Sequence, residues 1–210
     1  MNNKVLYDLS YGVYITTTMD GERPVGCVTN SVMQITSSPA TIAVSVNHDN
    51  YTNACIRKNG HFAVSILTET SDASLIGTFG FHSSRDTDKF KDASCKMLEG
   101  LPVINDASGC IVCKVIDTMD TATHTVFLGE IIAMEALTPG TPMTYAYYHK
   151  VIKGESPKNA PTYQPEEEQA SAIRWKCMIC GYIYEGNPLP ADFKCPICGV
   201  GAEMFEKITE

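Results

Sequence analysis

The chain has 210 residues, 44% of them hydrophobic, which is enough for one ordinary domain with a buried core plus a second, small one. A net charge of -8, from 16 Lys and Arg against 24 Asp and Glu, argues against nucleic acid as a partner, because no basic cluster is present to bind phosphates. Because we find no signal-peptide pattern and no apolar run of the roughly 20 residues that a membrane helix needs, we expect a soluble, cytoplasmic protein with no membrane partner.

The first 153 residues are predicted to form a mainly β domain with short helices. Two segments have helical character, Asn53–Lys58 and Asp72–Phe79. Turn pairs such as Asp20-Gly21 and Asn59-Gly60 separate strand-like runs, several of which alternate apolar and polar residues. These patterns predict an antiparallel barrel with helical insertions. The strand-like runs are Tyr11–Thr18, Val25–Ile35, Thr41–Val46, Phe62–Leu67, Cys110–Ile116 and Thr125–Met134.

Small polar residues cluster where some of these runs end. One cluster lies at residues 29–31, another at residues 45–47, and a third at residues 50–53, just where the first helix is expected. A helix N-terminus with Thr52 and Asn53 as caps can bind an anion such as a phosphate, and a later loop supplies Arg85 and Lys89 as further anion partners. Each cluster taken alone is also explained by ordinary loop and cap chemistry. The sequence has no glycine-rich dinucleotide motif and no Walker loop.

Residues 154–172 differ in composition from what precedes them. Segment 156–165 carries three prolines, and Glu166–Glu168 adds a run of negative charge, which together predict a semi-extended linker. The remaining residues, 173–210, are too few to be held by an apolar core alone. Domains below about 40 residues usually need a metal or disulfides, and we expect the nine cysteines of an intracellular protein to stay reduced or to bind metal.

Two Cys-x-x-Cys-Gly loops in this small domain predict a metal site. They supply Cys177 and Cys180, then Cys195 and Cys198, and four thiolates in two paired loops suit zinc or a single iron. Spacing alone leaves a structural zinc ribbon and a redox-active iron open. Neighbouring aromatic residues favour iron, because they can exclude water from the site; they are Trp175, Tyr182, Tyr184, Phe193 and Phe205.

A third Cys-x-x-Cys pair, Cys110 and Cys113, falls in a predicted strand. Residues three apart on a strand point to opposite faces, so these two thiols cannot share a metal, and we expect them to pack in the barrel wall.

The small domain resembles rubredoxin, whose four cysteines hold one iron that cycles between ferric and ferrous states. The resemblance rests on Trp175-Lys176-Cys177, on Gly181-Tyr182 and on Phe193-Lys194-Cys195-Pro196. Residues 1–150 resemble the flavin reductase-like split β-barrel family, through motifs such as Gly26–Thr36 and Thr123–Glu130. That resemblance implies non-covalent FMN binding near a homodimer interface. The implied flavin-binding residues are Thr29, Asn30, Ser31, Ser45, Val46 and Asn47, the phosphate-binding residues are Thr52, Ser83, Arg85 and Lys89, and His124 lies near the flavin or nicotinamide.

His124 is given a binding role, because hydride transfer to a flavin needs positioning and a dry stack rather than a strong base.

The whole chain is similar to the high-molecular-weight rubredoxins of anaerobic bacteria. This resemblance implies an electron-transfer flavoprotein that oxidises NADH or NADPH through FMN and passes single electrons by way of the rubredoxin iron to a flavodiiron protein that reduces nitric oxide or oxygen. Two alternatives remain at this point: a free-flavin reductase with a structural zinc ribbon, and a flavin- and metal-binding sensor without turnover.

Overall fold

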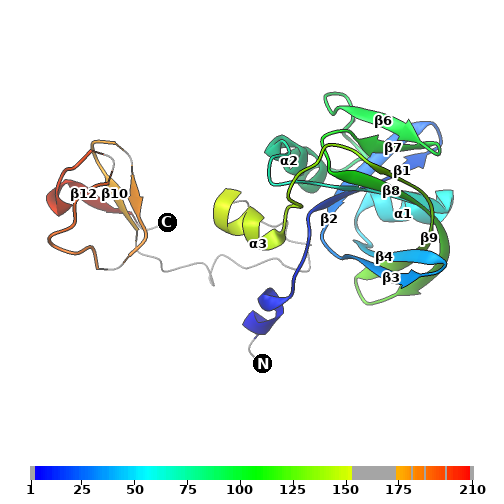
Figure 1. Ribbon diagram of the computed structural model, residues 1–210, viewed down its shortest axis with the longest axis horizontal. Coiled ribbons are helices and arrows are strands. Elements are labelled where there is room, and N and C mark those ends of the chain that lie inside the picture. Colours follow the sequence, from blue (N-terminus) through cyan, green and yellow to red (C-terminus); the bar gives the residue numbers. More distant parts are fainter. Residues whose placement is uncertain (1–2, 153–173, 181, 187, 197, 209–210) are drawn as a thin grey trace. The chain divides into compact units, whose positions relative to one another are not determined.

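The computed structural model describes residues 3–152, 174–180, 182–186, 188–196 and 198–208, and the chain forms two compact units, residues 1–162 and 163–210 (Figure 1). The predicted linker, residues 154–172, lies outside the described residues. Among the residues that are described, none of the helices is both long and apolar enough to cross a membrane.

The larger unit is built mainly from strands. The strands are β1 (Tyr14–Asp20), β2 (Arg23–Thr29), β3 (Val32–Ser37), β4 (Ala40–Asn47), β5 (His61–Ile66), β6 (Cys95–Leu98), β7 (Leu101–Ile104), β8 (Gly109–Asp120) and β9 (His124–Ala136). The helices are α1 (Tyr51–Asn59), α2 (Ala73–Phe81) and α3 (Tyr145–Tyr147), with a 3-10 helix η1 at Asn3–Asp8 and a π-helical turn η2 at Tyr148–Ile152.

Seven strands form one sheet in the order β2-β1-β5-β8-β9-β4-β3, and every pairing in it is antiparallel. Strands β6 and β7 make a separate antiparallel hairpin. Side chains along β4 point alternately to the two faces of this sheet. Ile42, Val44 and Val46 belong to a buried apolar cluster, whereas Ser45 and Asn47 point to the other face and are only partly buried. The core and the polar residues of β4 therefore lie on opposite faces of the sheet.

The predicted elements are found with shifted boundaries. Helix α1 begins two residues before the expected start, because Asn50 is its N-cap and accepts a hydrogen bond from the Thr52 amide at 3.1 Å. The expected caps, Thr52 and Asn53, were therefore wrong. The single run predicted at Val25–Ile35 is two strands, because β2 pairs with β1 whereas β3 pairs with β4. The β6–β7 hairpin and the C-terminal helical turns were missed.

Cys110 and Cys113 pack in the barrel wall as expected. Cys110 belongs to one buried apolar cluster and Cys113 to another, so strand β8 sends the two thiols to opposite faces. Burial raises the pKa of the Cys113 thiol to about 12, which makes it an inert core residue.

The smaller unit contains a three-stranded antiparallel sheet in the order β11-β10-β12. Its elements are β10 (Arg174–Cys177), β11 (Ile183–Tyr184), the 3-10 turn η3 (Ala202–Met204) and β12 (Phe205–Ile208). The buried apolar residues described in this unit are Cys177, Cys195 and Phe205, with partly buried aromatic residues packed around them. Two of these three are cysteines, so the centre of this unit is the predicted metal site itself.

Candidate metal centre and flavin site

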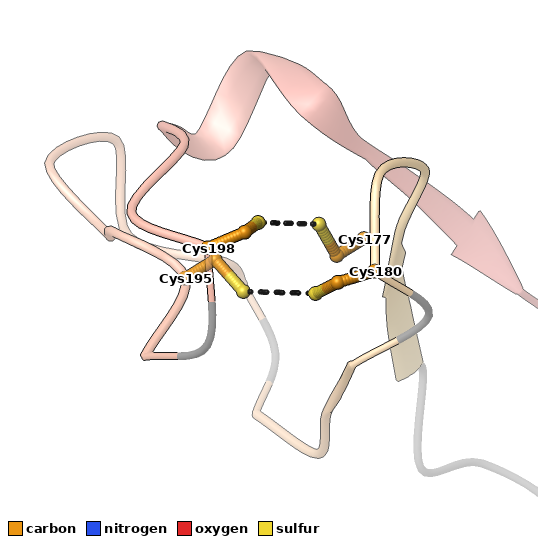
Figure 2. A group of neighbouring side chains, drawn as sticks. All are labelled: Cys177, Cys180, Cys195 and Cys198. Carbon is orange, nitrogen blue, oxygen red and sulfur yellow. Dashed lines mark hydrogen bonds between the residues drawn. The ribbon is translucent and has the colours of Figure 1, made fainter.

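The four predicted ligands of the smaller unit converge on one point. Figure 2 shows the side chains of Cys177, Cys180, Cys195 and Cys198 pointing toward one another from two loops. All four sulfur atoms lie within 4.8 Å of one another, with Cys177 Sγ 3.7 Å from Cys198 Sγ and Cys180 Sγ 3.4 Å from Cys195 Sγ. A tetrahedral site with metal–sulfur bonds of about 2.3 Å places sulfurs roughly 3.8 Å apart. The spacing therefore fits one tetrahedral metal ion.

The two loops have the same backbone design. In the first loop the Cys177 amide donates to the Tyr182 carbonyl at 2.8 Å, and in the second the Cys195 amide donates to the Val200 carbonyl at 2.8 Å. Gly199, which follows the last ligand, has a φ of 76°, the left-handed conformation that glycine adopts without strain. The corresponding Gly181 lies outside the described residues. Two matching turns thus present two thiols each from opposite sides.

Backbone amides point at the sulfurs. Burial opposes ionisation of Cys177, but the amides of Cys180 and Ile179 and the adjacent sulfurs outweigh it and hold the pKa of this thiol below its ordinary value. For Cys180 the Tyr182 amide favours the thiolate, yet burial and three neighbouring sulfurs raise its pKa to about 12. Four adjacent thiolates repel one another, and a cation at their centre removes this penalty. The donor set and its amide hydrogen bonds fit a single iron held by four cysteines.

The site is buried on one side and open on the other. Cys177 and Cys195 are buried, whereas Cys180 and Cys198 are exposed. The predicted aromatic residues do surround the buried side, with the ring of Phe193 4.5 Å from that of Tyr184 and 5.4 Å from that of Phe205. Cys180 and Cys198 therefore bring this side of the site to the surface of the unit.

In the larger unit, several predicted flavin-binding residues share one sheet face. The Ser45 amide donates to the Ser31 carbonyl at 3.0 Å, and Asn47 of β4 lies directly opposite His124 of β9. Ser45 and Asn47 alternate with Val46, whose side chain is in the core, so Val46 can contact a ligand on this face only through its main chain. The Val46 carbonyl already accepts a hydrogen bond from the Asn53 side chain at 2.9 Å.

Thr29 and Asn30 are buried at the end of β2, close to this face. The Thr29 hydroxyl lies 2.7 Å from that of Thr16, and the Asn30 side chain accepts a hydrogen bond from the Ser31 hydroxyl at 3.0 Å.

A cation-rich cluster surrounds the first turn of α1. The guanidinium carbons of Arg23 and Arg85 each lie 5.4 Å from the centre of the Tyr51 ring. Next to Tyr51, the Thr52 hydroxyl is buried beside the Cys27 thiol, a weak hydrogen-bonding group, and has no hydrogen-bond partner among the described residues. Asp20 already pairs with Arg23 at 3.5 Å and accepts a hydrogen bond from the Tyr51 hydroxyl at 2.7 Å. The unsatisfied Thr52 hydroxyl and the Arg85 guanidinium at this helix N-terminus suit an anion, so they fit the phosphate end of a flavin nucleotide.

The loop after α2 carries the other predicted phosphate residues. Ser83 and Arg85 are exposed, and the Ser83 hydroxyl accepts a hydrogen bond from the Arg85 amide at 3.1 Å. Lys89 is buried, and its ammonium group donates to the carbonyls of Gly26 at 2.8 Å and Phe79 at 3.0 Å. Burial lowers the pKa of Lys89, while the adjacent Cys27 acts in the opposite direction. Direct contact of Lys89 with a phosphate stays a prediction.

His124 lies at the start of β9, with Nδ1 2.8 Å from the Thr123 hydroxyl. Its pKa is lowered by partial burial and, to a smaller extent, by the charge of nearby His48. The lowered pKa favours the uncharged ring near neutral pH.

The family model for the flavin reductase like domain matches residues 6–155. The chain belongs to this family. A second model, for the rubrerythrin, rubredoxin-like domain, matches residues 175–206. Together with the strand-rich larger unit and the four-cysteine cluster, these matches confirm the predicted fold, a flavin reductase-like split barrel with a rubredoxin-like domain.

Among proteins of known function, the chain is similar to the high molecular weight rubredoxin of Moorella thermoacetica, with 40% identity over 99% of this chain and 100% of that protein. The resemblance seen in the sequence is thereby confirmed. The chain is also 37% identical to the ferric-chelate reductase (NAD(P)H) of Archaeoglobus fulgidus, over 78% of this chain and 98% of that protein.

Among solved structures, the larger unit is similar to the NADH:FAD oxidoreductase SgcE6 of Streptomyces globisporus C-1027, with a TM-score of 0.59 and 26% identity over 64% of this chain and 80% of that one. Flavin reductase PheA2 gives a TM-score of 0.59 and 25% identity over 69% of this chain and 93% of that one. A flavin reductase-like domain and a rubredoxin-like domain on one chain support flavin-mediated electron transfer.

Three residues of the candidate flavin site were not predicted from the sequence: Arg23, Tyr51 and Ser84. Arg23 and Tyr51 belong to the cation-rich cluster. Ser84 is hydrogen-bonded to Arg23 and to Gly26 of β2. Ser84 lies in the family-like segment 83–90 and Tyr51 in the polar cluster 50–53, but neither was assigned to the site, and the sequence holds no signal for Arg23.

Proposed function

We propose that this protein is a cytoplasmic electron-transfer oxidoreductase that oxidises NADH or NADPH and delivers single electrons to a flavodiiron protein, with FMN and one iron as cofactors. FMN accepts a hydride and releases its electrons one at a time, and a rubredoxin-type iron carries one electron at a time. The observation that carries the proposal is the presence of both sites on one chain: polar groups suited to a flavin nucleotide, and four thiols with metal spacing.

The residues of the larger unit bind and orient the flavin in this proposal. Thr29, Asn30, Ser31, Ser45, Asn47 and the main chain of Val46 hold the ring and ribityl chain, while Thr52, Ser83, Arg85 and the charge of Lys89 act on the phosphate. His124, uncharged near neutral pH, lies beside Asn47 and orients the nicotinamide against the ring. None of these residues has to transfer a proton, because hydride transfer depends on alignment and on the exclusion of water.

The smaller unit is the exit for electrons in this proposal. Cys177, Cys180, Cys195 and Cys198 hold the iron, and the exposed Cys180 and Cys198 face the surface where a partner protein docks. Met178 and Ile179, on the first loop, are 58% and 59% exposed and add an apolar contact beside these sulfurs. Transient electron-transfer partners make small interfaces of this type.

A homodimer is part of the proposal. Cross-strand pairing places Met33 on the same sheet face as Ala43 and Leu128, and it places Met119 in line with Val126 and Ser45. Met33 and Met119 are 62% and 59% exposed on the face that carries the flavin-binding residues. A second copy covering this face would bury exposed methionines and shield the flavin from water. Sedimentation of the parent and of Met119→Lys tests this: the parent should run as a dimer and the variant should dissociate.

The test is anaerobic stopped-flow mixing of the iron- and flavin-loaded protein with NADH and, separately, with NADPH. Flavin absorbance should bleach first and ferric–thiolate absorbance should follow in the same turnover, and a flavodiiron protein added afterwards should reoxidise both. Cys198→Ser is the matched variant, because it removes a metal ligand and leaves the flavin domain unchanged: NAD(P)H should still bleach its flavin, but electrons should no longer reach the partner.

Three results would contradict the proposal. Bleaching of the flavin without any reduction of the iron would favour a free-flavin reductase. Zinc as the dominant metal in protein produced with iron available would identify the four-cysteine site as a structural staple. Absence of NADH and NADPH oxidation with both cofactors bound would favour a sensor module.

A further inference from the structure

The loop between α2 and β6 carries Ser83 and Arg85, and it is fastened to β2 by a buried serine that the predicted phosphate set does not include. We call residues 82–89 the phosphate loop. We infer that Ser84 is a positioning residue, which fixes this loop against β2 so that Ser83 and Arg85 reach the flavin phosphate. The inference rests on the proposed FMN site and deepens it.

Ser84 is attached to β2 at three points. Its hydroxyl donates to the Gly26 carbonyl at 2.9 Å and accepts from the Gly26 amide at 3.2 Å. Its own carbonyl accepts from Arg23 Nη1 at 2.5 Å. The Ser84 side chain is turned into the protein and buried, whereas those of Ser83 and Arg85 on either side are exposed. Ser84 therefore holds the loop from within, and its neighbours are the ones presented to a ligand.

Gly26 is shaped for this attachment. A Cβ atom there would lie 3.0 Å from Thr17 Cγ2, 3.1 Å from the Thr16 carbonyl and 3.2 Å from a ring carbon of Phe79, which is tighter than most real contacts. A side chain at this position would crowd β1 and α2, so glycine lets both pack closely against β2 at the point where the loop is attached. The amide and the carbonyl of Gly26 both bond the Ser84 hydroxyl.

Lys89 fastens the other end of the same loop. Its ammonium group donates to the carbonyls of Gly26 and Phe79, so one glycine carbonyl receives hydrogen bonds from both Ser84 and Lys89. Phe79 lies in the last turn of α2, where a cation also offsets the negative end of the helix dipole. With its donors directed at carbonyls, Lys89 acts on a phosphate through its charge and through the loop.

The phosphate loop reaches α1 through Arg85. The Arg85 guanidinium lies over Tyr51, the first residue of α1, next to the unsatisfied hydroxyl of Thr52. A shift of the loop away from β2 would move this guanidinium away from the helix N-terminus. Ser84 is thus placed to set the phosphate contact without touching the phosphate.

The test compares FMN with riboflavin, which is the same ring and ribityl chain without the phosphate. Both ligands are titrated into the full chain after removal of its flavin, for the parent, Ser84→Ala and Ser71→Ala. Ser71 is a matched control: it is buried and its hydroxyl makes comparable bonds, to the Thr68 amide at 2.9 Å and the Asp106 carbonyl at 3.0 Å, away from the phosphate loop. The readout is the ratio of riboflavin Kd to FMN Kd, which a general loss of stability leaves unchanged.

Ser84→Ala should weaken FMN binding by about 10- to 100-fold, the loss expected for a hydrogen bond to a charged group, and leave riboflavin binding within about twofold of the parent. Ser71→Ala should lower thermal stability and keep the parent ratio. In an Arg85→Ala background, Ser84→Ala should cost clearly less than it does alone, because the two residues act on one contact.

A parent-like ratio in folded Ser84→Ala, or full additivity with Arg85→Ala, would overturn the inference. If Ser84→Ala does not fold, Ser84→Cys replaces the hydroxyl by a weaker hydrogen-bonding thiol and should lower the ratio in the same direction; an unchanged ratio there also counts against the inference. A parent protein that binds riboflavin as tightly as FMN would instead refute the proposed phosphate site itself.

Discussion

Gly129 in β9 is the position where one methyl group tests the packing of the larger unit most directly. A Cβ atom there would lie 2.7 Å from the Cβ of Cys113 and 2.7 and 2.8 Å from two ring carbons of Phe62. Non-bonded carbons normally sit about 3.5–4.0 Å apart. Cys113 and Phe62 are both 0% exposed and belong to the same apolar cluster, so neither can turn toward solvent. Gly129→Ala therefore overpacks the core.

We expect this substitution to destabilise the larger unit by about 1–3 kcal/mol, the usual cost of overpacking. At roughly 2–4 °C per kcal/mol for a domain of this size, the unfolding midpoint should fall by several degrees. Gly77→Ala is the matched control: a Cβ at Gly77, inside α2, meets nothing within 4 Å, and replacing a helical glycine by alanine stabilises by about 0.5–1 kcal/mol.

Thermal unfolding separates the two units spectroscopically. The single tryptophan, Trp175, lies in β10 and its fluorescence reports on the smaller unit, while the far-ultraviolet circular dichroism is dominated by the strands of the larger one. Gly129→Ala should move the dichroism transition and leave the Trp175 transition in place. Phe62→Leu should recover part of the loss when combined with Gly129→Ala. An unchanged midpoint for Gly129→Ala, or strict additivity with Phe62→Leu, would refute the packing argument.

The two sites give three further predictions. Removing the metal with a chelator should unfold the smaller unit, because two of the three buried apolar residues described in that unit are metal ligands. Trp175 fluorescence should report this unfolding, while the dichroism of the larger unit stays intact; native Trp175 emission after chelation would contradict the prediction. Cys195→Ser should abolish stoichiometric metal binding, whereas Cys110→Ser, in the barrel wall, should keep it; metal analysis decides, and metal loss in both variants would contradict the assignment.

The pKa of His124 is lowered in the folded state, so the unfolded chain binds its proton more readily and folding stability is lost as the pH falls from about 6.5 toward the folded-state value. Urea unfolding over a pH series should show this slope in the parent and a weaker one in His124→Gln; equal slopes would contradict it.

The metal centre could be predicted almost completely from the sequence because its geometry is local. Each pair of ligands sits in one short turn, Cys177 with Cys180 and Cys195 with Cys198, and the turn residues that shape each loop are its sequence neighbours. The expectation for Cys110 and Cys113 was correct for the same reason, since strand alternation depends only on the local backbone.

The phosphate end of the proposed flavin site could be predicted only in part. Thr52, Ser83 and Arg85 lie in polar segments that are recognisable along the chain, but the caps of α1 were misplaced by two residues, and Val46 proved to have its side chain in the core. The alternation of Ile42, Val44 and Val46 with Ser45 and Asn47 already indicates which side of β4 faces the core, so the inward side chain of Val46 was readable from the sequence.

By itself, the amino-acid sequence determined the four-thiol centre, the strand-rich character of the first 150 residues and the polar segments from which a flavin site is built. Only the tertiary structure decided that Arg23, Tyr51 and Arg85 meet, and that the side chains of Ser84 and Lys89 both donate hydrogen bonds to the carbonyl of Gly26. The physical reason is sequence separation: the metal loops close over three residues, whereas the contact of Lys89 with Gly26 spans 63 positions and forms only when β2 and α2 pack together.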